Sequence, residues 1–68
     1  MLIITLFVDD VDQISFLEYM LIQTDLHYTI EVNDGRYGLQ SPYLLVDGVP
    51  LDETRSYKWI SEQFSKNH

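Results

Sequence analysis

The stretch that most constrains the fold of this 68-residue chain runs from Gln40 to Glu53 and holds an Asp-Gly pair between apolar runs. Such a pair is the strongest short-range signal of a β-hairpin, because a type I′ turn needs positive φ at both central residues. We therefore expect strands on both sides of Asp47-Gly48. Pro50 lacks a backbone N–H, so the returning strand is expected at a sheet edge.

A helix is expected directly after this hairpin. Asp52 or Thr54 is a suitable N-cap. Apolar side chains then recur at helical spacing, at Tyr57, Ile60 and Phe64. A hairpin followed by a helix occurs in many folds, so this half of the chain alone leaves the fold open.

The N-terminal half predicts a strand–helix–strand unit. Residues Leu2–Val8 form an apolar, β-branched run typical of a strand buried on both faces. Asp12 is the expected N-cap of a helix over Gln13–Gln23. Residues Leu26–Val32 alternate between apolar and polar, as in a strand with one wetter face. A unit of this length predicts a parallel crossover.

The expected helix over residues 13–23 is apolar on more than one side. One stripe consists of Ile14, Leu17, Met20 and Leu21, and three further apolar residues lie outside it, namely Phe16, Tyr19 and Ile22. Our preferred interpretation is that a small domain buries most of this helix. The alternative is that the three outlying residues form part of an interface.

Composition indicates a single globular domain over residues 1–68, with 46% hydrophobic and 22% charged residues. A core this small gives little net stability, so a partner or self-association is plausible. No apolar run approaches the ~20 residues that span a bilayer. Residues Met1–Val8 lack the basic region and cleavage site of a signal peptide. We therefore expect a cytoplasmic protein that does not bind membranes.

The net charge of −7 belongs to one half of the chain. Residues 1–34 contain seven Asp or Glu and no Lys or Arg, whereas residues 35–68 contain four acids and four bases. This field repels nucleic-acid phosphates and attracts basic surfaces. We expect no nucleic-acid partner and a protein partner with a basic surface.

The order of these segments resembles the glutaredoxin family. Ser41-Pro42 matches its proline corner, Asp47-Gly48 its hairpin turn and Asp52-Glu53 its final helix entry. The resemblance implies a small thioredoxin-like α/β fold, β-α-β-(short turn)-β-β-α, with a mixed four-stranded sheet and a cis peptide before Pro42. Only nine residues, 33–41, replace a helix of the family, so a short turn or loop is expected there.

The resemblance also covers the N-terminal half. Counting from the first strand, the family's first active-site cysteine falls on Asp12 and the second position falls on Ser15. The chain contains no cysteine. An aspartate can cap a helix, but it cannot attack a disulfide as a thiolate does. The resemblance therefore implies a degenerate, redox-inactive member without catalytic residues or cofactor.

The preferred functional hypothesis is a protein-binding module that is not an enzyme. It would act through the acidic edge where relatives carry their active site. Acids there would repel the carboxylates of glutathione, so retained glutathione binding is not expected. The expected binding residues are Asp9, Asp10, Asp12, Ser15, Arg36, Tyr37, Ser41, Pro42, Asp52 and Glu53.

Three alternatives stay open. An acidic inhibitor that mimics nucleic acid, a type common in viruses, would need acids along an extended face, whereas these cluster in loops. A metal-dependent site would use the cluster Asp9-Asp10-Asp12, whose spacing matches no metal motif. His27 and His68 are too isolated for zinc. A homo-oligomer would use Tyr19, Tyr37 or Trp59.

Overall fold

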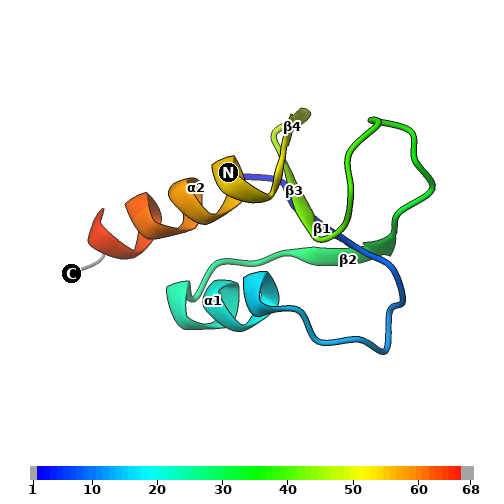
Figure 1. Cartoon of the computed structure of the whole chain (residues 1–68). Coiled ribbons are helices and arrows are strands. Elements are labelled where there is room, and N and C mark those ends of the chain that lie inside the picture. Colours follow the sequence, from blue (N-terminus) through cyan, green and yellow to red (C-terminus); the bar gives the residue numbers. More distant parts are fainter. Residues whose placement is uncertain (1, 67–68) are drawn as a thin grey trace.

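The protein is a two-layer α/β fold, and its computed structural model describes residues 2–66 (Figure 1). The elements follow the predicted order β-α-β-β-β-α. They are β1 (Ile4–Val8), α1 (Phe16–Thr24), β2 (Thr29–Val32), β3 (Tyr43–Val46), β4 (Val49–Leu51) and α2 (Glu53–Lys66).

The sheet has four strands in the order β2-β1-β3-β4. β1 pairs with β2 in parallel, as the crossover predicted, and with β3 antiparallel. β3 and β4 form the antiparallel hairpin. The predicted mixed four-stranded sheet is therefore confirmed, with β2 and β4 as its two edges.

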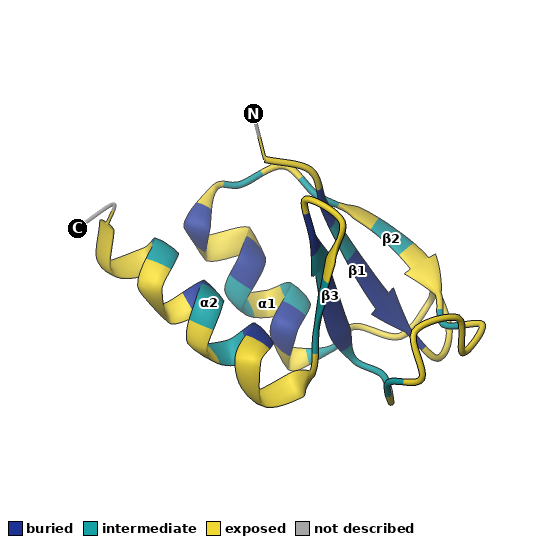
Figure 2. Ribbon diagram, turned by 90° about the horizontal axis from the view of Figure 1, so that it is seen from above, coloured by how far each residue is buried: buried dark blue, intermediate teal, exposed yellow. Residues whose placement is uncertain are grey.

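Both helices lie on the same face of the sheet, where the core forms (Figure 2). Alternate residues of β1 and β3 point into this core because side chains of a strand alternate between faces. The buried residues of the core are Ile4, Leu6, Val8, Leu17, Leu21, Leu44, Val46 and Ile60. The predicted burial of the first strand is thus confirmed for β1.

The opposite face of the sheet carries an aromatic cluster beneath the loop that joins β2 to β3. Phe7 and Tyr43 are fully buried there, with ring centroids 4.8 Å apart. Tyr37 contacts both rings edge-on, and the Arg36 guanidinium lies 5.5 Å from the centre of the Phe7 ring. This loop contains no helix, as its length predicted.

The predicted hairpin turn is confirmed by positive φ at Asp47 (49°) and Gly48 (85°). Pro50 lies on the edge strand β4. Its missing N–H therefore does not interrupt the hydrogen bonds between the interior strands of the sheet. The Asp52 carboxylate accepts the N–H of Arg55 at 2.9 Å, so Asp52 caps α2 as expected.

Three predicted starts were wrong. β1 begins at Ile4 rather than Leu2, and β2 begins at Thr29 rather than Leu26. α1 begins at Phe16 rather than Gln13, because residues 10–13 form a turn in which Asp10 Oδ1 accepts the N–H of Asp12. Asp25, in the left-handed region (φ 61°), ends α1.

The preferred expectation that α1 is mostly buried was also wrong. Leu17 and Leu21 are fully buried, but the three apolar residues outside their stripe are exposed: Phe16 by 62%, Tyr19 by 58% and Ile22 by 61%.

In the part of the chain that the structure describes, neither helix combines the length and apolar composition that crossing a bilayer requires.

Candidate functional site

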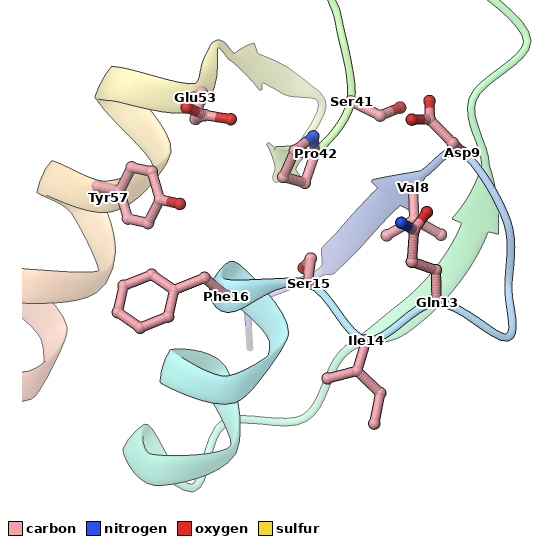
Figure 3. Close-up of a pocket in the computed structure, with 10 residues that line it drawn as sticks. All are labelled: Val8, Asp9, Gln13, Ile14, Ser15, Phe16, Ser41, Pro42, Glu53 and Tyr57. Atoms are coloured by element: carbon pink, nitrogen blue, oxygen red, sulfur yellow. The ribbon is translucent and has the colours of Figure 1, made fainter.

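A pocket opens where the N-terminus of α1, the residue pair before β3 and the first turns of α2 meet (Figure 3). Its volume of about 290 Å³ is at the lower end of the range of ~300–1,000 Å³ for ligand pockets. That size suits one or two side chains of a peptide better than a large cofactor. The lining residues are Val8, Asp9, Gln13, Ile14, Ser15, Phe16, Ser41, Pro42, Glu53 and Tyr57.

Ser15 is the N-cap of α1 and one of the residues that line this pocket. Its backbone is extended (φ −92°, ψ 161°), and its Oγ accepts the N–H of Glu18 at 3.1 Å. The expectation that Asp12 caps the helix was wrong. Asp12 is exposed in the preceding turn and does not line the pocket. Ser15, which the resemblance aligned with the second active-site position of glutaredoxins, caps the helix instead.

The peptide bond between Ser41 and Pro42 is cis, as the resemblance implied. Both residues line the pocket together with Ser15. Ser41 Oγ is buried and has no hydrogen-bond partner within residues 2–66. An unpaired buried hydroxyl is unfavourable by roughly 1–3 kcal/mol, so Ser41 carries a polar group that this fold leaves unsatisfied beside the pocket.

An aromatic wall closes one side of the pocket. Phe16 and Tyr57 reach toward each other from α1 and α2, with ring centroids 5.8 Å apart (Figure 3). Tyr19 stacks behind Phe16 at 6.2 Å. The sequence indicated Phe16 and Tyr19 only as part of an alternative interface and did not predict the contact with Tyr57. The available signal was the position of Phe16 and Tyr19 outside the buried stripe of the helix.

Asp9 and Glu53 supply the charge of the pocket, and none of its described lining residues is basic. A second depression adjoins it and shares Ser41 and Glu53. Its lining adds Asp52 and Thr54 from the start of α2, together with Gly38, Leu39 and Gln40. Because the two depressions share Ser41 and Glu53, we refer to them together as the acidic groove.

The structure brings six of the ten expected binding residues to this groove: Asp9, Ser15, Ser41, Pro42, Asp52 and Glu53. The remaining four lie outside its lining. Asp10 and Asp12 belong to the turn before α1. Arg36 pairs with Asp34 at 3.0 Å, and Tyr37 packs in the aromatic cluster.

The Arg36–Asp34 pair is exposed and strongly hydrogen-bonded. These hydrogen bonds hold the pKa of the Asp34 carboxyl below its ordinary value and raise the pKa of Arg36. Asn33 fixes the same loop, since its side chain donates to Leu39 O and accepts from Tyr43 Oη, both at 3.0 Å. These residues shape the loop beside the groove.

Among residues 2–66, the geometry supports neither a metal centre nor a histidine base at the pocket. Within residues 2–66, no three side chains of His, Asp or Glu gather as a metal-binding group, so the cluster Asp9-Asp10-Asp12 gains no support from the geometry. His27 lies at a different depression, with Leu2 and Asp25, and cannot activate Ser15 as a base. His68 lies outside the described residues.

A scan against protein-family models, a search of curated proteins and a search of solved structures each found no match to this chain.

Proposed function

We propose that this protein is a redox-inactive, glutaredoxin-like module of the cytoplasm that binds an extended segment of another protein in the acidic groove. One observation carries the proposal: Ser15, at the N-terminus of α1, and the cis residue Pro42 line the same pocket. The resemblance to glutaredoxins implies a docking site at this junction. Here the junction is built without a thiol.

The composition of the groove supports binding rather than catalysis. The Ser15 hydroxyl is already engaged as a helix cap, and a serine has no sulfur that could form a nucleophilic thiolate. Glutathione is a poor fit, because its carboxylates would meet Asp9 and Glu53 without a basic lining residue. A segment carrying Lys or Arg suits these acids better.

An apolar side chain next to the basic one would complete the fit. The exposed ring of Phe16 offers apolar surface beside Tyr57, and buried aromatic contacts dominate the energetics of many interfaces. Ser41 lines both depressions and so lies where they join. These features support a partner segment with neighbouring apolar and basic residues.

Affinity capture from cells that produce the protein tests this proposal with two matched variants of α1. Phe16→Ala removes the aromatic wall, whereas Ile22→Ala removes an apolar side chain of nearly equal exposure (62% and 61%) outside the groove. We expect wild type and Ile22→Ala to retain the same partner and Phe16→Ala to lose it. Retention by all three would contradict the proposal.

Charge reversal separates this proposal from mimicry of nucleic acid. Glu53→Lys changes the groove, and Glu62→Lys makes the same change on an exposed part of α2 outside it. We expect only Glu53→Lys to weaken capture. A nucleic-acid mimic would instead lose its partner to added DNA and would be insensitive to Phe16→Ala.

A further inference from the structure

A second surface lies along the free edge of strand β2. This edge shares no residue with the acidic groove, so a partner could bind it whether or not the groove is occupied. The sheet order leaves β2 with one neighbour, β1. The other edge strand, β4, is interrupted by Pro50, so it is protected against further pairing.

The register shows which backbone groups of β2 face outward. Val8 pairs with Val32, and the N–H of Asn33 donates to Val8 O at 2.7 Å. In a parallel ladder this pattern turns the backbone groups of Glu31 and Asn33 toward β1. The N–H and C=O of Ile30 and Val32 therefore point away from the sheet, where no further strand of the described chain lies.

The side chains along this edge alternate in chemistry as well as in direction. Ile30 and Val32 lie on the helix-covered face, in register with core residues of β1, yet Val32 is 48% exposed. Thr29 and Glu31 lie on the open face and are exposed. An added strand would cover Val32 with its apolar residues and meet Glu31 with the residues between them.

The charge of the residues around β2 indicates which kind of protein segment would bind there. Residues 18–32 contain Glu18, Asp25 and Glu31 but no Lys or Arg. Arg36, the nearest base in sequence, is held by Asp34 at 3.0 Å. A second copy of this chain would bring its own Glu31 to the same place, and like charges across strands are destabilising.

We propose that the free edge of β2 binds an extended basic segment of a partner protein as a fifth strand of the sheet. Alternating residues of this segment are apolar over Ile30 and Val32 and basic opposite Glu31. The outward N–H and C=O groups of Ile30 and Val32 supply the backbone hydrogen bonds, as in other cases of strand addition.

Amide hydrogen exchange with a blocked peptide of alternating Lys and Val tests this proposal. We expect the peptide to slow exchange at Ile30 and Val32 by about tenfold or more, with less effect at Glu31, whose N–H already faces β1. The same peptide with N-methyl groups on its sheet-facing amides should give no protection. Equal protection by both peptides, or none by either, would overturn the proposal.

Variants of Val32 sharpen the test. Val32→Pro deletes one outward N–H while leaving the Asn33 bond to Val8 in place, and Val32→Thr keeps that N–H on a β-branched residue. Peptide protection of Ile30 should be lost in Val32→Pro and kept in Val32→Thr. Peptide-induced changes confined to Ser15 and Tyr57 would overturn it, as would a dimer of the protein alone that Val32→Pro abolishes.

Discussion

The hydroxyl of Ser56 accepts the backbone N–H of Leu44 at 3.0 Å and joins helix α2 to strand β3. The same hydroxyl donates to the carbonyl of Leu51 at 2.9 Å, so it bridges the ladder between β3 and β4. Ser56 is fully buried, and one side chain thus satisfies two backbone groups away from water.

Ser56→Ala should therefore lower the free energy of unfolding by about 1–3 kcal/mol, because it removes the hydrogen bonds that Ser56 makes with the N–H of Leu44 and the C=O of Leu51. Ser61→Ala is the control, since Ser61 is exposed on the same helix. Urea unfolding measures both. Equal stability of the two variants would show that the bridge contributes nothing.

Alanine substitutions test whether Ser15 or Asp12 is the N-cap of α1. Ser15→Ala should destabilise the protein by about 1 kcal/mol, because the N–H of Glu18 loses its acceptor. Asp12→Ala should change stability by less than about 0.5 kcal/mol, since Asp12 is exposed before the helix. Thermal or urea unfolding would reveal the reverse order if Asp12 were the cap.

The hairpin turn depends on backbone conformation at Gly48. Its φ of 85° is unfavourable for a residue with a Cβ, although a Cβ there would meet nothing within 4 Å. Gly48→Ala should therefore cost about 1–2 kcal/mol of stability through the backbone alone. Gly48→Asn should cost less, because Asn tolerates the left-handed region. Equal losses in the two variants would argue against this cause.

Two of the five tyrosines should ionise late. Burial raises the pKa of Tyr28. The Glu18 carboxylate accepts a hydrogen bond from the Tyr28 hydroxyl at 3.2 Å and raises this pKa further. Burial also raises the pKa of Tyr43. The folded state holds these protons more tightly than the unfolded chain does. Their stabilising contribution is therefore complete below pH ~10 and is lost as pH rises through the folded pKa values.

Ultraviolet titration at alkaline pH measures this directly. We expect two late-ionising tyrosines in the wild type and one in Tyr28→Phe. Ionisation of Tyr28 and Tyr43 at the pH of an unfolded tyrosine would contradict the raised pKa of these two groups.

The parts of the fold that follow local rules could be predicted from the sequence. The Asp47-Gly48 turn, the edge position of Pro50 and the Asp52 cap each depend on a few neighbouring residues. The parallel pairing of β1 and β2 followed from the length of their connection.

The start of α1 was predicted wrongly because two good caps compete. Asp12 and Ser15 both suit an N-cap, and the sequence does not show that the Asp10 carboxylate turns the chain back on Asp12. The contact that forms the aromatic wall was not predicted for a related reason. Contact between Phe16 and Tyr57 depends on how two helices far apart in sequence pack together.

The most direct test of the central claim is amide NMR of the isotope-labelled protein bound to the partner recovered by capture. We predict that the largest shift changes fall at Ser15, Phe16 and Tyr57, which line one pocket with Pro42. They should be absent when the partner is added to Phe16→Ala. Changes confined to Ile22 and Ser61, or to the exposed turn at residues 10–12, would contradict the assignment of the groove as the docking site.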